Sequence, residues 1–156
     1  MNAISLEVSI MADPRFEEFY GYRFEELSEG MTAAYGRTIT ESDILLFAGI
    51  SGDTNPVHLN EELAADSMFK GRIAHGMLSS SFISTVFGTK LPGPGCIYLS
   101  QTLKFKAPVR AGDTVVARVT LLELVPEKRK ALFKTECTVG DTVVLTGEAE
   151  IMVPKR

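Results

Sequence analysis

Residues 76–88, GMLSSSFISTVFG, decide the fold of this 156-residue chain. Large apolar side chains recur in this stretch at helical spacing, and the remaining positions hold only Gly, Ser or Thr. The large side chains are Met77, Leu78, Phe82, Ile83, Val86 and Phe87. A helix that is apolar or small nearly all round is usually buried. We therefore expect a buried helix from Gly76 to about Phe87, with Gly88 as the residue just beyond its end.

Downstream of this helix the hydrophobic period changes from that of a helix to that of a strand. Residues 88–95 are rich in Gly and Pro, which indicates a loop. Apolar and polar residues then alternate in four runs, over residues 97–106, 115–121, 131–139 and 143–151. Each run has one apolar face, which is typical of an antiparallel sheet covered on one side. The 76–87 helix is the element suited to cover that face.

Upstream, a short β-prone stretch spans residues 35–40, and Thr40 then caps a helix that ends at Ser51–Gly52. Asn60 caps a second short helix. A strand, a buried helix and then a meander of strands predict an α+β hot-dog fold, in which an antiparallel sheet wraps around a long central helix. We expect residues 1–30 to form an N-terminal extension and lead-in, and residues 31–156 to form a single hot-dog domain.

Composition excludes several classes of protein. The net charge of −4 and pI near 5.2 argue against a nucleic-acid binder. No apolar run approaches the ~20 residues that span a bilayer, and the start of the chain lacks the features of a signal peptide. Cys96 and Cys137 are too far apart for a CxxC motif and are expected to be buried free thiols. We therefore expect a cytoplasmic protein with no nucleic-acid or membrane partner.

The loop of residues 52–58, Gly-Asp-Thr-Asn-Pro-Val-His, carries the best candidate for catalytic chemistry. On a continuous helix Asp53 and His58 would lie roughly 140° out of phase, and only the break at Pro56 allows them to converge. A His beside a carboxylate can exchange protons with a bound water. The alternative interpretation is a turn in which Asp53 caps a backbone amide and His58 simply packs. We see no set of metal ligands and no GxSxG motif, so no metal is expected.

Further candidates surround the start of the buried helix. Gly76 would leave backbone N–H groups open to a polarised carbonyl oxygen, although it is equally consistent with an ordinary turn glycine. His75 is more typical of a structural residue that caps or orients the helix start. Ser84 on its own is typical of a small packing residue. Four basic residues could meet the phosphates of a phosphate-bearing ligand or simply be solvated. They are Lys70, Arg72, Lys104 and Lys106.

Three signatures between Phe47 and Val119 resemble the (R)-specific enoyl-CoA hydratases of the MaoC-like dehydratase family. They are Ser51-Gly52-Asp53-Thr54-Asn55-Pro56-Val57-His58, then Ile73-Ala74-His75-Gly76-Met77, then Phe105-Lys106-Ala107-Pro108-Val109 with Gly112-Asp113. Thr54 stands where relatives often carry a bulkier residue, which touches the shape of the pocket and not the chemistry.

The resemblance implies a role for each matching residue. Asp53 and His58 would be the catalytic pair, Gly76 would meet the thioester carbonyl, and Ser84, Asn55 and His75 would be supporting residues, Ser84 by supporting the active-site Asp. The implied reaction is reversible hydration of a trans-2-enoyl thioester to the (R)-3-hydroxyacyl product. It needs no cofactor, since coenzyme A or an acyl carrier protein arrives with the substrate. The resemblance also implies a homodimer or higher homo-oligomer.

Two other functions remain open on the sequence. A hot-dog acyl-CoA thioesterase would share the fold and the ligand but would cleave the thioester. A non-catalytic acyl-thioester-binding module would bind the same ligand without turnover. The presence of both Asp53 and His58 favours the hydratase over the binding module.

Overall fold

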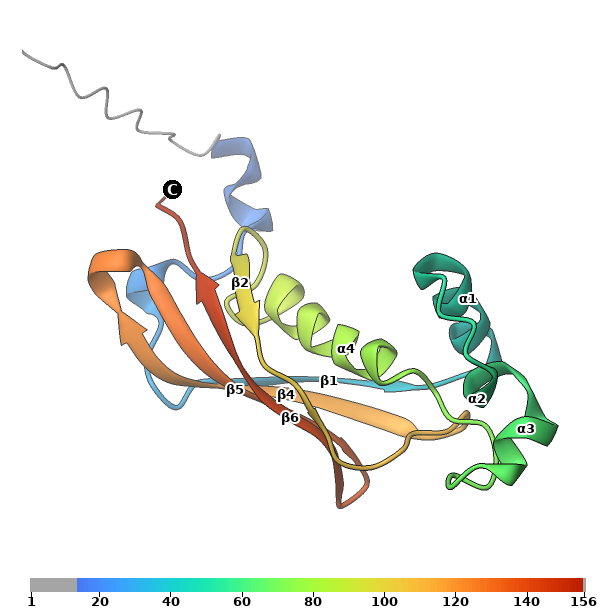
Figure 1. Ribbon diagram of the computed structural model, residues 1–156. Coiled ribbons are helices and arrows are strands. Elements are labelled where there is room, and N and C mark those ends of the chain that lie inside the picture. The colour runs from blue at the N-terminus through green and yellow to red at the C-terminus, as the bar shows by residue number, and fades with distance from the viewer. Residues whose placement is uncertain (1–13, 156) are drawn as a thin grey trace, which may run out of the picture.

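The computed structural model describes residues 14–155 and shows an antiparallel sheet that curves around one long helix, α4 (Figure 1). The short 3₁₀ helices are η1 (Pro14–Phe19), η2 (Phe24–Glu26) and η3 (Pro126–Lys128). The α-helices are α1 (Glu41–Ser51), α2 (Pro56–Leu59), α3 (Glu61–Asp66) and α4 (Gly76–Thr89). The strands are β1 (Thr32–Thr38), β2 (Ile97–Gln101), β3 (Lys104–Phe105), β4 (Thr114–Val125), β5 (Lys130–Val139) and β6 (Thr142–Met152). The α+β hot-dog prediction is confirmed.

The sheet follows the order β1-β4-β5-β6-β2, with β3 also paired to β6. All of these pairings are antiparallel, and three of the four predicted alternating runs become the continuous strands β4, β5 and β6. The remaining run, 97–106, is divided into β2 and β3. Gly147 lies beside this break, where an added Cβ would come 1.7 Å from the Thr102 carbonyl oxygen. A side chain at residue 147 would therefore prevent the chain from passing β6 in this way.

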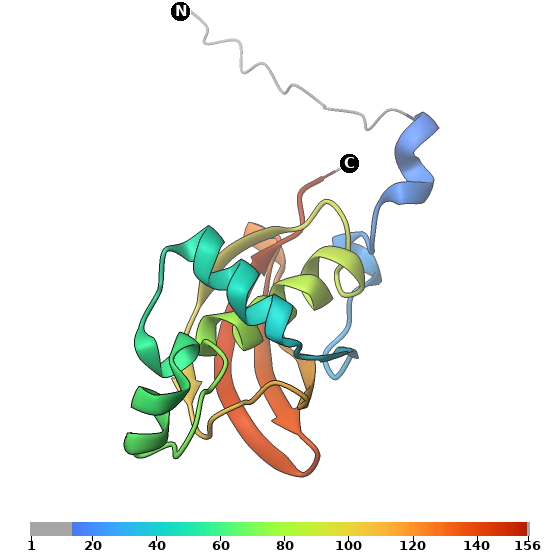
Figure 2. The same ribbon diagram turned by 90° about the vertical axis from the view of Figure 1, so that its right-hand side faces the viewer.

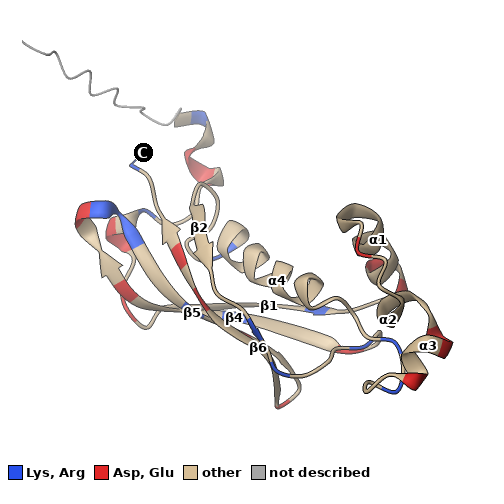
Figure 3. Ribbon diagram, in the orientation of Figure 1, with Lys and Arg blue, Asp and Glu red and all other residues tan. Residues whose placement is uncertain are grey.

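Helix α4 lies across the concave face of the sheet and carries no charged residue (Figure 3). It packs against β1, β4 and β5 and buries five large side chains, those of Leu78, Phe82, Ile83, Val86 and Phe87. The prediction that it ends before Gly88 is wrong. The Lys90 N–H still bonds to the Val86 carbonyl at 2.9 Å, so the helical ladder continues through Gly88 and ends at Thr89.

The first strand and the packed part of the chain both begin earlier in the sequence than predicted. Strand β1 starts at Thr32, earlier than expected, because its pairing with β4 extends to Thr120. Phe24 and Leu27 are both buried in the core, so the packed unit begins before residue 31. The first 13 residues of the predicted extension lie outside the described residues.

Helices α1, α2 and α3 gather at the end of the molecule where α4 begins (Figures 1 and 2). The predicted caps at Thr40 and Asn60 are confirmed, since their side chains accept hydrogen bonds from the N–H groups of Asp43 and Leu63. None of the helices within residues 14–155 is long and apolar enough to cross a membrane. Because α1, α2 and α3 lie at the end where α4 begins, they bring the loop that contains Asp53 next to the start of α4.

Candidate active site

The loop between α1 and α2 is held in shape by hydrogen bonds among its own residues. The Asp53 N–H donates to the Ser51 hydroxyl at 3.1 Å, and the Asn55 N–H donates to Asp53 Oδ1 at 3.2 Å. The Asn55 side chain in turn accepts from the Val57 N–H and so caps α2, which begins at Pro56. Asn55 thus has a double structural role, and its backbone orients the Asp53 carboxylate.

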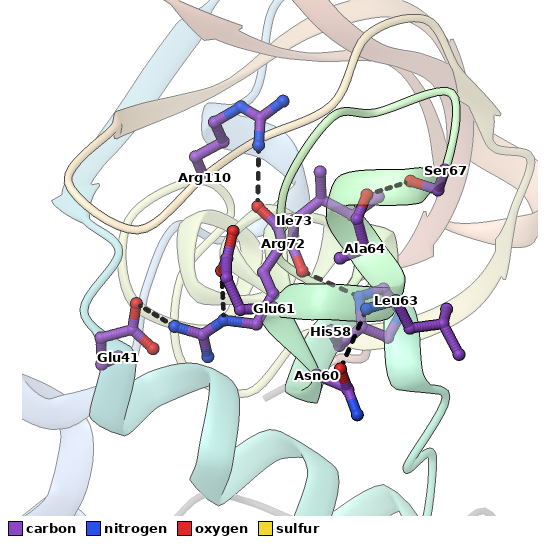
Figure 4. A network of polar contacts seen from close by, with 10 residues as sticks. All are labelled: Glu41, His58, Asn60, Glu61, Leu63, Ala64, Ser67, Arg72, Ile73 and Arg110. Atoms are coloured by element: carbon purple, nitrogen blue, oxygen red, sulfur yellow. Dashed lines mark hydrogen bonds and ion pairs between the residues drawn. The ribbon is translucent and has the colours of Figure 1, made fainter.

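His58 is buried beside this loop, and its ring orientation is fixed by a backbone contact. Its Nδ1 donates to the Ile73 carbonyl at 2.8 Å (Figure 4). A carbonyl can only accept, so the proton lies on Nδ1 when the ring is neutral, and Nε2 carries the free lone pair. Nε2 lies 4.0 Å from Asp53 Oδ2. The structure therefore brings together the carboxylate and the imidazole that the break at Pro56 was predicted to bring together.

His75 lies directly against the other two residues of this group. Its Nε2 donates to the backbone carbonyl of Asp53 at 2.9 Å, and its ring stacks on that of His58 with centroids 3.8 Å apart. His75 is the N-cap residue of α4, but its side chain makes no capping hydrogen bond. The first N–H groups of α4 therefore have no side-chain partner. A helix N-terminus that binds a ligand needs its N–H groups open in this way.

A mostly apolar pocket of about 430 Å³ opens beside His58 and the start of α4. Gly76, Ser79 and Phe105 are among the residues that line it. A Cβ at Gly76 would lie 2.6 Å from the Phe105 ring, so glycine is needed for the helix start to approach that ring. The size of the pocket lies within the range of small-molecule sites.

Asp53, His58 and His75 each offer a possible metal-ligand atom within 4.8 Å of the others. The two imidazole rings lie against each other with an angle of 31° between their planes. One nitrogen of each ring is also engaged by a backbone carbonyl. A tetrahedral ion needs several lone pairs directed at it, so this cluster fits proton transfer better than metal binding.

Ser84 and most of the basic candidates lie apart from this group. Ser84 is exposed two turns along α4 from Gly76, about 12 Å along the helix axis. Its predicted support of Asp53 stays a prediction, and the single chain does not bring the two together. Arg72 is bound to Glu61 and Glu41 at 3.0 and 2.9 Å, so its charge is neutralised (Figure 4).

The other three basic candidates are all exposed, and of these Lys106 lines the pocket, whereas Lys70 and Lys104 do not. Both cysteines are free thiols, as predicted, and Cys137 is buried and Cys96 half-buried. Burial, with a smaller contribution from Glu136, raises the pKa of Cys137 to about 12, and burial also raises the pKa of Cys96. Neither thiol is a candidate nucleophile, since the thiolate is the reactive form.

Sequence reasoning missed three contributors to the site. The Ile73 carbonyl orients His58, but a backbone atom leaves no signal in residue type. Phe105 was placed on a strand, and its contact with Gly76 joins segments far apart in the chain. Ser79 was counted only among the small residues of the helix. Its spacing of four from His75 was the available signal, because residues at that spacing share a helix face.

A family model and two similar proteins point to the same protein family. The model of the MaoC like domain matches residues 24–146. An (R)-specific enoyl-CoA hydratase from Rhodospirillum rubrum is 62% identical over 133 residues, covering 85% of this chain and 92% of the relative. A 3-hydroxybutyryl-CoA dehydratase from Methylorubrum extorquens is 52% identical and covers 85% of each chain.

Solved structures agree with this result. An unliganded R-hydratase from Pseudomonas aeruginosa superposes with a TM-score of 0.81 at 46% identity, over 87% of this chain and 88% of that one. An (R)-hydratase from Aeromonas caviae superposes with a TM-score of 0.80 at 38% identity, over 83% of this chain and 99% of that one. The fold and the sequence thus point to one group of proteins.

Proposed function

The chain belongs to the MaoC-like dehydratase family, and from this premise we propose that it catalyses the reversible hydration of trans-2-enoyl-CoA to (R)-3-hydroxyacyl-CoA. It is accordingly a hydro-lyase. The observation that carries the proposal is the approach of Asp53 Oδ2 to His58 Nε2, at 4.0 Å, beside an apolar pocket. The names of the relatives from Rhodospirillum rubrum and Methylorubrum extorquens support the same reaction and substrate class.

The pair is suited to hold a water molecule. Because Nδ1–H of neutral His58 donates a hydrogen bond to the Ile73 carbonyl, the free nitrogen Nε2 offers only a lone pair. The ionised Asp53 carboxylate also offers only lone pairs. Two acceptors 4.0 Å apart leave room for one water at ordinary hydrogen-bond lengths of about 2.8 Å from each. Such a water donates one hydrogen to each residue and directs its own lone pairs toward the substrate.

Hydration then follows without any further reagent. The water oxygen forms a bond to C3 of the enoyl group while the C2–C3 π electrons move toward the thioester carbonyl. The water proton passes to the Asp53–His58 pair, and the pair delivers a proton to C2. We assign these two transfers to the pair as a unit, because strongly interacting groups titrate together. The carbonyl oxygen carries the transient negative charge.

The start of α4 is the group that stabilises this charge. The N–H of Gly76 belongs to the positive end of the helix dipole, and no side chain caps this end. Removing one such donor typically raises a barrier by ~3 kcal/mol. Lys106, which lines the pocket, is the basic residue that we propose for coenzyme A phosphate. The reaction draws on no cofactor beyond the coenzyme A of the substrate, and the two free thiols fit a reducing, cytoplasmic setting.

The function is tested with crotonyl-CoA by following enoyl-thioester absorbance and free thiol together. Loss of absorbance without thiol supports hydration, thiol release supports the thioesterase, and binding without turnover supports the acyl-binding module. In the reverse direction, dehydration of the (R)-3-hydroxyacyl-CoA and not of its enantiomer is expected.

The catalytic pair is tested by substitution. Asp53→Asn and His58→Ala should each lower kcat by at least about 10²-fold, the usual contribution of a positioned acid–base group. Asp66→Asn is the matched control, since it removes an exposed carboxylate on α3. Near-normal activity of either Asp53→Asn or His58→Ala, with the circular dichroism of the native fold, would refute the assignment.

We also propose that the functional form is a homodimer joined along the free edge of β2. Three consecutive residues of this strand, Ile97, Tyr98 and Leu99, are exposed by 37–42%. An exposed apolar edge strand is a template for pairing with another chain. The pairing of two β2 strands would cover these side chains.

A further inference from the structure

His75 takes part in the site without facing the substrate. Only 2% of its surface is exposed, and its ring contacts the rings of His58 and Phe47, with centroids 3.8 and 5.0 Å away. Its Nε2 donates to the Asp53 backbone carbonyl at 2.9 Å. This bond crosses from the buried start of α4 to a loop whose Asp53 side chain is 52% exposed. This buried hydrogen bond thus restrains the backbone of Asp53, the residue that carries the carboxylate.

The bond requires one particular tautomer of His75. The Asp53 carbonyl can only accept, so Nε2 must carry the hydrogen, and Nδ1 of the neutral ring is left as an acceptor. Nδ1 is buried and has no hydrogen-bond partner among the described residues. A buried polar atom in this condition costs about 1–3 kcal/mol unless a donor serves it.

A matching donor lies one helical turn away. The Ser79 hydroxyl is also buried and also without a partner among the described residues. Residues four apart on a helix share a face, with Cβ atoms about 5–6 Å apart. The acceptor that a helical serine usually uses, the carbonyl four residues back, is that of His75. It already accepts from the N–H groups of Leu78 and Ser79, at 3.0 and 3.4 Å.

We propose that His75 is a positioning residue in a polar chain that runs from Ser79 through His75 to the Asp53 carbonyl. The structure shows no direct hydrogen bond between the two atoms, so the Ser79 hydroxyl donates to Nδ1 through one bound water, or directly after rotation of its side chain, and thereby holds the hydrogen on Nε2. Nε2–H fixes the Asp53 backbone, and this bond is the contribution of His75 that the site depends on. His75 does not line the pocket and acts through the geometry of the catalytic pair.

Two substitutions of His75 separate this role from packing. A Gln amide nitrogen reaches the place of Nε2, whereas an Asn amide reaches only the place of Nδ1, and both lose the stacked ring. We expect His75→Gln to keep kcat within about fivefold of the wild type, with KM unchanged. His75→Asn should lower kcat on the order of 10²-fold at similar KM, the usual effect of displacing a catalytic group by about 1 Å. Equal impairment of the two variants would overturn the proposal.

A second measurement is independent of substrate and of folding defects at residue 75. The chain has only two histidines, so long-range ¹H–¹⁵N spectra resolve both rings. The His75 ring should show a protonated Nε2 and a bare Nδ1 in the wild type. Ser79→Ala should shift the Nδ1 resonance and admit the other tautomer, whereas Ser81→Ala, an exposed position on the same helix, should change neither.

A protonated Nδ1 of His75 in the wild type, or spectra that do not respond to Ser79→Ala, would overturn the proposal of a polar chain from Ser79 to Asp53. The kinetic test rests on the proposed hydratase function, but the spectra do not. If the wild type failed to hydrate enoyl-CoA, the proposed function would fall, and the spectra would still decide whether this polar chain exists.

Discussion

At the scale of single residues, Gly76 is constrained by two requirements at once. Its N–H is the proposed donor to the thioester carbonyl, and its missing side chain leaves room for the Phe105 ring. The clash that a Cβ would create is with ring atoms of a side chain that is 54% exposed. The ring can move outward, so the constraint concerns the shape of the pocket more than the stability of the fold.

We therefore expect Gly76→Ala to lower kcat/KM by roughly 10–100-fold, equivalent to about 1.4–2.7 kcal/mol. The displaced Phe105 ring and the new methyl group both obstruct the approach of a carbonyl to the N–H. The free energy of unfolding in urea should change by less than about 1 kcal/mol, since alanine is the better helix former. Gly88→Ala is the control, because nothing lies within 4 Å of a Cβ there. Unchanged kcat/KM in Gly76→Ala would show that the helix start is not approached by substrate.

At the scale of elements, helix α1 begins with a reciprocal cap. The Thr40 hydroxyl accepts from the Asp43 N–H at 3.2 Å, and the Thr40 N–H donates to the Asp43 carboxylate at 2.8 Å. Hydrogen bonds from the side chain and backbone of Thr40, with the charge of Arg37, hold the pKa of Asp43 below its usual value. This cap sets where α1 starts, and α1 leads directly into the loop that carries Asp53.

Thr40→Ala should lower the free energy of unfolding by about 1 kcal/mol at neutral pH. Asp43 has a lower pKa folded than unfolded, so its contribution is present above the unfolded value and is lost as pH falls through the folded one. The difference between wild type and variant in urea unfolding curves should therefore narrow as the pH falls below about 3.9, the usual pKa of an aspartate. Thr40→Ser, which keeps the hydroxyl, should behave as the wild type. A difference that stays constant over this range would show that the carboxylate takes no part in the cap.

The same elements show how far the sequence predicts this structure. Periodicity located α4 and the strands because their apolar faces are buried in one core, and the Pro56 break predicted that Asp53 and His58 converge. The end of α4 cannot be placed from Gly88, because a glycine is typical of the residue after a helix, although here helical hydrogen bonding continues past it. The contact of the Ile73 carbonyl with His58 and the three contacts of His75 could not be predicted, since they depend on tertiary packing between segments.

At the scale of the whole molecule, the sheet and α4 place the site at one end. Segments that are far apart in the sequence meet there and line one pocket. They are the end of the 52–58 loop at His58, the start of α4, and the parts of β3 and β6 around Phe105 and Leu145. Catalysis needs groups held to within a fraction of an ångström, and rigid elements provide this better than loops alone. The β2 edge, which starts just after the loop that follows α4, is the edge proposed above for the homodimer.

The two edges of the sheet differ in a way that selects one for dimer formation. Edge strand β1 carries Arg37, and its one large apolar side chain, Tyr35, packs against the core, whereas β2 exposes Ile97, Tyr98 and Leu99 in succession. Charged side chains discourage pairing between edges, and exposed apolar ones favour it. The protein should therefore elute with a mass near twice the 17.0 kDa of one chain in size-exclusion chromatography with light scattering.

Leu99→Asp should shift this mass to that of a single chain, because the dimer would bury two carboxylates without partners. Ile50→Asp is the matched control, since Ile50 is 85% exposed on α1 and even more accessible than Leu99, at 41%. If apolar exposure alone drove association, Ile50→Asp would dissociate the dimer as well. If Leu99→Asp kept the mass of two chains, the interface would lie elsewhere. Dissociation by Leu99→Asp alone thus assigns the contact to the β2 edge, at a distance from the Asp53–His58 pair.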